Sequence, residues 1–190
     1  MSANQSSRPD SADPGAGAGR DAARPGAGHD AARRDASHGD RILSAWRRLS
    51  RRPGGRWLFS RLIGRFAPYT GSMGARVETL EPGGATVTLR DRRRVRNHLR
   101  SVHAIALANL GELATGLAMT TAMPAGVRGI PTAIRIDYVK KARGTLTCAA
   151  TVAAPDVTEP TSHEVVGHIR NEEGDVVATI RVTWALERVT

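Results

Sequence analysis

Residues 102–119 read VHAIALANLGELATGLAM, a run that is apolar on almost every side when it is wound into a helix. A helix at a protein surface keeps one polar face, so a helix without such a face is buried. Other segments instead alternate apolar with polar residues, namely 85–90, 134–139, 146–152 and 176–186. Strict alternation is typical of antiparallel strands with one covered face. We predict an α+β fold in which an antiparallel sheet, with two strands before the helix and four after it, wraps around one long central helix.

The residues before this domain divide into two segments. Residues 1–40 are mostly Ala, Gly, Pro, Asp, Arg and Ser, with too few apolar side chains to offset the entropy lost on ordering. We predict a disordered tail there and a folded domain over residues 68–190. Residues 41–67 place apolar residues at helical spacing on both sides of Pro53, and they hold eight arginines and no acidic residue. They predict two basic amphipathic helices that end at Pro68. These helices either pack on the domain with their arginines in water or rest on an anionic lipid surface.

The net charge of +10 is concentrated in one segment, because the eight arginines of residues 41–67 contribute +8. Aromatic residues make up 4% of the chain, and no helix-turn-helix or zinc-finger spacing is present, so we do not expect nucleic acid as the main partner. The single cysteine, Cys148, excludes a disulfide framework and suits a reducing cytoplasm. We also find no apolar run long enough to span a membrane and no apolar N-terminal signal region. We therefore expect a cytoplasmic protein.

Two polar residues of the predicted helix suggest chemistry. Glu112 is a carboxylate in an apolar segment, where it needs a partner, a water-lined cavity or a raised pKa. Such a group suits general-base catalysis, and the structural alternative is a glutamate hydrogen-bonded at a subunit interface. His103 lies at the start of the helix, where unpaired backbone N–H groups can hold a carbonyl oxygen. Glu112 lies nine residues after His103, and each residue of a helix adds about 100° of rotation and about 1.5 Å of rise. The two side chains therefore lie on opposite faces of the helix and about 13 Å apart along its axis. If both act on one substrate, two chains must contribute, and a dimer would also cover the edge strands and the exposed helix flank.

Other reaction types lack support in the sequence. There is no GxSxG elbow, no glycine-rich phosphate loop and no metal-ligand spacing, and Cys148 falls on an inward strand position. Two basic clusters lie on either side of the central helix in the sequence. One runs from Arg90 to Arg100 and includes Arg94 and Arg96, and the other consists of Lys140, Lys141 and Arg143. Each cluster is either a solvated face or a site for phosphate groups.

Residues 97–104 (NHLRSVHA) and 108–116 (ANLGELATG) together resemble the active-site stretch of hot-dog-fold acyl-CoA thioesterases. Those enzymes carry an Asn, then a Gly-x-x-His-Gly-Gly segment, then an Asp or Glu nine residues past the His. The matching positions here are Asn97, His103 and Glu112. The segments PYTG (68–71) and DYVKKARG (137–144) look closer still to an uncharacterised bacterial branch of this superfamily. The resemblance covers residues 45–188.

The resemblance implies a hot-dog-fold homodimer, or a dimer of dimers, that hydrolyses acyl-CoA or related acyl thioesters without a metal or an organic cofactor. The Ala104 amide would polarise the thioester carbonyl. His103 and Asn97 would orient this group or its attacking water, and the partner subunit's Glu112 would act as base or nucleophile. The expected substrate-binding residues are Asn109, Thr115, Arg94, Arg96, Lys140, Lys141 and Arg143. Ala104 and Ile105 replace the Gly-Gly pair and narrow the approach of the acyl group, so a non-catalytic acyl-CoA-binding or interaction module is the alternative.

Overall fold

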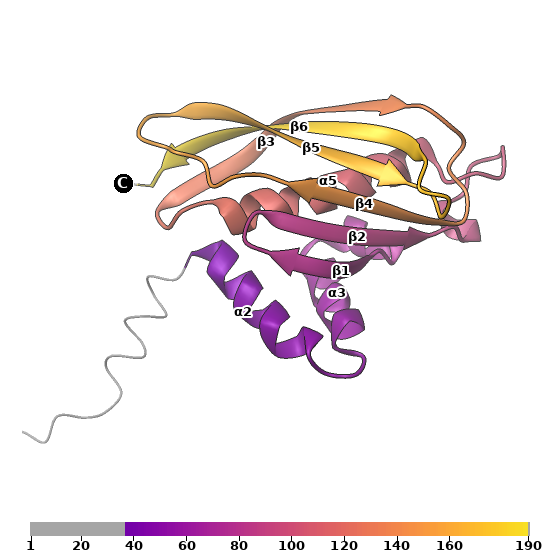
Figure 1. The fold of residues 1–190 in the computed structure, drawn as a ribbon, viewed down its shortest axis with the longest axis horizontal. Helices are drawn as coiled ribbons and strands as arrows, with labels where there is room; N and C mark the ends of the chain where they lie inside the picture. Colours follow the sequence, from indigo (N-terminus) through magenta and orange to yellow (C-terminus); the bar gives the residue numbers. More distant parts are fainter. Residues whose placement is uncertain (1–36, 190) are drawn as a thin grey trace, which may run out of the picture.

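The computed structural model describes residues 37–189 and shows one sheet with a long helix against it and further helices at one side (Figure 1). The helices are α2 (His38–Ser50), α3 (Gly55–Phe66), α4 (Pro68–Met73) and α5 (Ala104–Ala122), with a short 3-10 turn, η1 (Arg93–Val95). The strands are β1 (Arg76–Glu81), β2 (Gly84–Arg90), β3 (Val127–Tyr138), β4 (Thr145–Thr151), β5 (Thr161–Arg170) and β6 (Val176–Arg188). Most of the predicted tail, residues 1–36, lies outside the described residues. Helix α2 begins at His38, inside the segment assigned to that tail.

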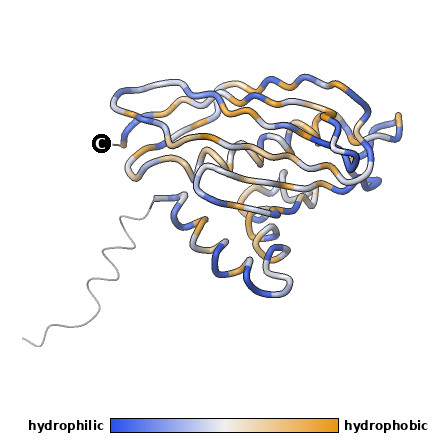
Figure 2. Tube along the Cα trace, in the orientation of Figure 1, coloured by the Kyte–Doolittle hydropathy of each residue, from blue (hydrophilic) through white to orange (hydrophobic). Residues whose placement is uncertain are grey.

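The six strands form one antiparallel sheet in the order β1-β2-β4-β5-β6-β3, and the sheet curves around α5. Two strands precede α5 and four follow it, which confirms the predicted α+β fold. The strands alternate between orange and blue in Figure 2 because successive side chains point to opposite faces. The inward side chains of the central strands are fully buried, among them Val87, Cys148, Ile169 and Ile180.

Close packing of α5 on the sheet depends on a glycine in the helix. A Cβ atom at Gly111 would lie only 2.5 Å from Cγ2 of Ile180 in β6. The missing side chain therefore lets the helix backbone approach the strand. This contact fixes the rotation of α5 about its axis, and so determines that the next residue, Glu112, lies on the flank of the helix.

Helices α2 and α3 form a hairpin that packs beside β1 and α5. The rings of Trp46 and Phe59 meet edge to face at 5.0 Å between centroids, and both side chains are buried. Burying a side chain such as Phe59 contributes roughly 1.5–3 kcal/mol. The Ser60 hydroxyl accepts a hydrogen bond from the Val77 N–H at 3.0 Å, which ties α3 to β1. None of the described helices is both long enough and apolar enough to cross a membrane.

The prediction that Pro68 only ends the second amphipathic helix was incomplete. Helix α3 does end just before it, but Pro68 is also the first residue of α4. Proline is favourable at this position because its fixed φ suits a helix and its missing N–H would be unpaired there in any case. Helix α4 brings Thr70 against α5, as described below.

Candidate active site

The start of α5 is organised by His103, which is its N-cap residue. Its Nδ1 accepts a hydrogen bond from the Ile105 N–H at 3.1 Å, so the ring carries its proton on Nε2. Its own N–H donates to the Val95 carbonyl at 2.7 Å, which fixes the loop against η1. The imidazole is exposed, and Nε2–H is left as a donor at the surface.

Ala104, the first residue of α5, offers a second donor at this end of the helix. The first N–H groups of a helix have no partner within the helix. His103 accepts the bond from the Ile105 N–H, whereas the Ala104 N–H has no acceptor among residues 37–189. The carbonyl of Ala104 accepts a hydrogen bond from the Tyr138 hydroxyl at 3.1 Å, which holds the helix start beside the end of β3. A fixed, unpaired N–H at a helix N-terminus is the kind of donor that stabilises an oxyanion.

Asn97 shapes the loop before the helix. Its Oδ1 accepts hydrogen bonds from the Leu99 N–H at 2.9 Å, the Ser101 N–H at 3.2 Å and the Ser101 hydroxyl at 3.3 Å. These bonds close a tight turn in which Arg100 has a left-handed φ of 55°. The carbonyl end of Asn97 is thus used by the loop, and only its NH₂ group is left for a ligand.

Glu112 lies on a flank of α5 that the rest of residues 37–189 covers only in part. Its side chain is half-buried and has no hydrogen bond or ion pair among residues 37–189, and burial raises the pKa of its carboxyl. Ile105, two helical turns earlier on the same flank, is 54% exposed. On the inner face of edge strand β3, Ile134 and Tyr138 are about half-exposed. We call these four residues the α5–β3 surface.

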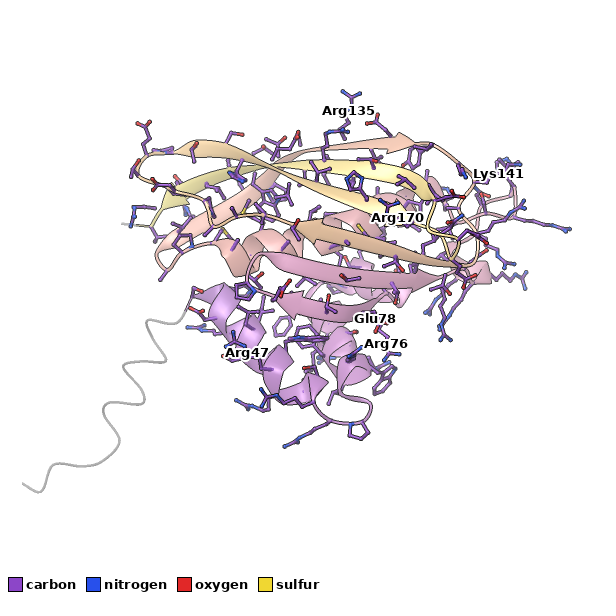
Figure 3. The ribbon with its side chains drawn as sticks, in the orientation of Figure 1. Arg47, Arg76, Glu78, Arg135, Lys141 and Arg170 are labelled. Atoms are coloured by element: carbon purple, nitrogen blue, oxygen red, sulfur yellow. The ribbon has the colours of Figure 1, made fainter. Side chains whose placement is uncertain are left out.

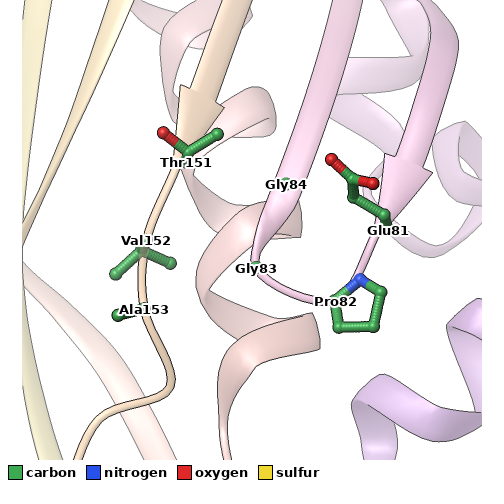
Figure 4. A pocket seen from close by; sticks show the side chains of 7 residues that line it. All are labelled: Glu81, Pro82, Gly83, Gly84, Thr151, Val152 and Ala153. Carbon is green, nitrogen blue, oxygen red and sulfur yellow. The ribbon is translucent and has the colours of Figure 1, made fainter.

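The structure does not bring Glu112 to His103 within one chain. Helix α5 is continuous from Ala104 to Ala122, so nine residues still separate the two side chains by about 13 Å along the axis. Two depressions on the surface of the described residues contain none of the expected site residues. One lies at the far end of α5, beside Gly83 and Thr151 (Figure 4), and the other lies on the outer face beside Ile130 and Ser162.

The two other expected site residues of α5, Thr115 and Asn109, lie in the interior. Thr115 is fully enclosed; its hydroxyl donates to the Gly111 carbonyl at 2.9 Å, and its methyl group faces Gly167 of β5. Asn109 is also buried, and its Oδ1 accepts a hydrogen bond from the Thr70 hydroxyl at 2.9 Å. The Nδ2 atom of Asn109 has no partner among the described residues. Thr70 was not identified from sequence, although it lies in the PYTG segment that carried part of the resemblance.

The fold joins the two basic clusters near the start of α5. The Asp91 N–H donates to the Gly144 carbonyl at 3.0 Å and the Val102 N–H to the Ala142 carbonyl at 2.8 Å, so the two loops run side by side. Figure 3 shows Lys141 at this end of the molecule.

Three of the five basic side chains expected to bind substrate are already occupied. Arg94 donates to the Met73 carbonyl at 3.4 Å, Arg96 pairs with Asp91 at 2.6 Å and Lys140 with Asp175 at 2.6 Å. Lys140 also lowers the pKa of the Asp175 carboxyl through this hydrogen bond and its charge. Lys141 and Arg143 are exposed and form no ion pair within residues 37–189, so of these five side chains they are the two that remain available to an anionic ligand.

Cys148 cannot supply a nucleophile to this region. It is fully buried on the inner face of β4, and burial raises the pKa of its thiol to about 12. A thiol with such a pKa is almost entirely protonated near neutral pH, and only the thiolate is reactive. Cys148 is therefore not a candidate nucleophile for a reaction at the start of α5.

Residues 55–186 match the model of a family described as a domain of unknown function (DUF4442). The chain belongs to this family. The crystal structure of the genomics protein APC5556 is 31% identical to it, with a TM-score of 0.69, and the match covers 80% of this chain and all of the other. No curated protein matches the sequence.

More distant structures share the fold. PA5026 from Pseudomonas aeruginosa, described as a probable thioesterase, is 22% identical over 68% of this chain and 93% of its own, with a TM-score of 0.63. A variant of the phenylacetic acid degradation protein PaaI from Thermus thermophilus is 22% identical over 62% and 97%, with a TM-score of 0.54. This family member thus has the hot-dog fold that thioesterases also use, which confirms the resemblance seen in the sequence.

Proposed function

We propose that this protein hydrolyses acyl-CoA or a related acyl thioester, without metal or organic cofactor, in a site shared by two subunits of a homodimer. The observation that carries the proposal is Glu112, a half-buried carboxylate without a partner among the described residues, on a partly covered flank of α5. The same helix presents the unpaired Ala104 N–H at its start. A base and an oxyanion donor are the two groups that hydrolysis of a thioester needs most.

A second subunit is required because one chain keeps these groups about 13 Å apart. In a two-fold dimer built on the α5–β3 surface, the partner subunit's Glu112 would face Ala104 and His103 of this chain. The half-exposed apolar side chains of Ile105, Ile134 and Tyr138 support such an interface, since large apolar groups gain by leaving water. A dimer of dimers would keep the same shared site.

In the proposed reaction the thioester carbonyl oxygen accepts a hydrogen bond from the Ala104 N–H. The partner subunit's Glu112 takes a proton from a water molecule, the water oxygen bonds to the carbonyl carbon, and the carbon–sulfur bond then breaks. The carboxyl returns its proton to the departing thiolate, so the products are a carboxylic acid and a free thiol. His103, through Nε2–H, and Asn97, through its NH₂ group, orient the thioester or the water. Direct attack by the Glu112 carboxylate, followed by hydrolysis of the anhydride, is the second route open to the same geometry.

Burial prepares Glu112 for the role of base. A carboxylate with a raised pKa holds a proton more strongly, so it removes one from water more readily. Lys141 and Arg143 would meet the phosphates of the carrier at the rim of the site, with Arg94, Arg96 and Lys140 contributing after exchange of their present partners. We place this activity in the cytoplasm, which the single buried cysteine suits.

The test is release of free thiol from acyl-CoAs with short, long and aromatic acyl groups. Glu112→Ala should lower the rate by about 10²–10⁴-fold. Glu164→Ala is the matched control, because Glu164 is an exposed glutamate on the outer face of β5. Absence of turnover across all three classes of acyl group would contradict the proposal.

The alternative is a non-catalytic acyl-CoA-binding or interaction module of the same fold. It is favoured by Ile105, whose branched, exposed side chain stands at the helix start where the related enzymes carry glycine. Tight binding of acyl-CoA by calorimetry, without release of thiol from any substrate, would select this alternative over hydrolysis.

A further inference from the structure

Helix α3 has one face in the core and one face that no described element covers. Phe59 is buried, whereas Leu58, Arg61, Leu62 and Arg65 follow each other at the i, i+3, i+4, i+7 spacing that places them on one face. The two leucines are 42% and 41% exposed. Trp57 beside them is 57% exposed, and the Arg61 guanidinium lies over its ring at 5.2 Å from the centroid.

Six exposed arginines lie on the two helices of the hairpin and in the turn that joins them. They are Arg47, Arg48, Arg51, Arg52, Arg61 and Arg65. None of the six forms an ion pair within residues 37–189. Residues 1–36 hold five arginines and five aspartates, so this preceding segment carries no net charge with which to neutralise them. We call Trp57, Leu58, Leu62 and the six arginines the α2–α3 surface.

This composition restricts what the surface can bind. Exposed leucines gain free energy only against an apolar phase, whereas unpaired arginines gain it against anionic groups. A nucleic acid backbone would satisfy the arginines and leave Leu58 and Leu62 in water. A membrane that contains anionic lipids offers both phases, with phosphates at the level of the arginines and acyl chains beneath them.

We propose that the α2–α3 surface docks the protein on anionic lipid membranes, with α3 lying in the plane of the membrane–water interface. The hairpin is suited to this because it projects from the molecule on the side away from the outer face of the sheet (Figures 1 and 3). Figure 3 shows Arg47 on the hairpin and Arg135 on the opposite side. Phe66, which is 88% exposed at the end of α3, extends the apolar contact toward α4. This inference does not depend on the proposed hydrolase activity.

Binding of the full-length protein to vesicles tests the proposal. Vesicles of phosphatidylcholine with about one third phosphatidylserine should sediment the protein at low salt, and vesicles of phosphatidylcholine alone should not. Because each arginine near an anionic surface contributes about a fivefold increase in affinity, Arg61→Gln/Arg65→Gln should weaken binding by about 10–30-fold. Leu58→Ser/Leu62→Ser should weaken it by a similar factor, since these side chains enter the apolar layer.

Two controls separate this site from the effect of net charge and from misfolding. Arg135→Gln/Arg170→Gln removes the same two charges from exposed positions on the sheet and should bind vesicles like the wild type. Tryptophan fluorescence gives a second readout, because Trp46 and Trp184 are buried and only Trp57 is exposed among the three. Vesicles should shift the emission of the wild type to shorter wavelength, and Trp57→Phe should lose this shift.

Several results would overturn the proposal. The wild type would not bind anionic vesicles at low salt. Alternatively, Arg61→Gln/Arg65→Gln and Arg135→Gln/Arg170→Gln would lose vesicle affinity equally, or Leu58→Ser/Leu62→Ser would bind vesicles as strongly as the wild type. A change of oligomeric state in that leucine variant, measured by light scattering, would show instead that the surface joins two copies of the chain. Stronger binding to single-stranded RNA than to vesicles, independent of the two leucines, would assign the arginines to nucleic acid.

Discussion

The α5–β3 surface and the α2–α3 surface are both apolar and exposed among residues 37–189, and they differ in the charge that accompanies them. The α5–β3 surface carries one carboxylate, Glu112, and no basic residue, whereas the α2–α3 surface carries six arginines and no acid. An unpaired carboxylate among apolar groups gains most against another protein surface that supplies hydrogen-bond donors. A field of arginines among apolar groups gains most against an anionic membrane surface. Exposed apolar area alone therefore does not identify the partner of a surface. The charged and polar groups within that area identify it.

The largest effect is expected where the α5–β3 surface meets the start of α5. Ala104→Pro removes the one N–H group assigned to the thioester oxygen, and it should lower the rate of thiol release by about 10²–10³-fold. Proline is tolerated at the first helical position, and His103 already has the extended backbone (φ −64°, ψ 142°) that a residue before proline prefers. The melting temperature should therefore stay close to that of the wild type.

Ala104→Ser provides the matched control, because it changes the side chain and keeps the N–H. The serine variant should retain most of the activity. If the proline variant were as active as the serine variant, the Ala104 N–H would have no role in catalysis. The α5–β3 surface would then differ from the α2–α3 surface only in what binds to it.

The next largest effect concerns assembly. Ile134→Asp places a charge in the apolar part of the α5–β3 surface, and it should raise the dissociation constant of the dimer by about 30-fold or more, with loss of activity at low protein concentration. Ile130→Asp is the control, since Ile130 is a similarly exposed isoleucine on the outer face of the same strand. Light scattering on dilution measures both variants. Equal dissociation of the Ile134→Asp and Ile130→Asp dimers would show that the inner face of β3 is not the interface. Neither variant should change the binding of the protein to vesicles.

The sequence predicted the central part of this fold because two strong periodic patterns agree with the tertiary structure. The run from 102 to 119 is apolar all round, and it forms the helix that the sheet encloses. The alternation over 134–139 also predicted a strand, but not that Ile134 and Tyr138 would be half-exposed. Alternation reports which side chains share a face, whereas exposure depends on whether another element reaches that face. β3 is an edge strand, and the other described elements leave its inner side chains Ile134 and Tyr138 partly uncovered.

The site was only partly predictable for a similar reason. Glu112 was recognisable as an isolated carboxylate in an apolar helix, a property of the local sequence. The pairing of Lys140 with Asp175 and the enclosure of Thr115 against Gly167 depend on contacts between residues far apart in the chain. Asn97 was assigned from the motif, yet the motif gave no indication that its Oδ1 would be used by the loop before the helix.

The smallest predicted effect is on stability, and it compares the two surfaces through their charges. Burial raises the pKa of Glu112 from its ordinary value of 4.5, so the folded state favours the protonated carboxyl. The protonated carboxyl therefore contributes fully to the stability of the folded state when the pH is below 4.5, its ordinary pKa. This contribution is lost as the pH rises through the higher pKa of the folded state. Glu112→Gln, which is always neutral, should therefore match the wild type in melting temperature near pH 4 and exceed it by a few degrees near pH 8. Arg61→Gln on the α2–α3 surface should show no such dependence, because it leaves the Glu112 carboxyl unchanged. If the melting temperatures of the Glu112→Gln variant and the wild type differed by the same amount at pH 4 and pH 8, the Glu112 carboxylate would be well solvated. The α5–β3 surface would then lack the desolvated carboxyl group that distinguishes it as a site for catalysis.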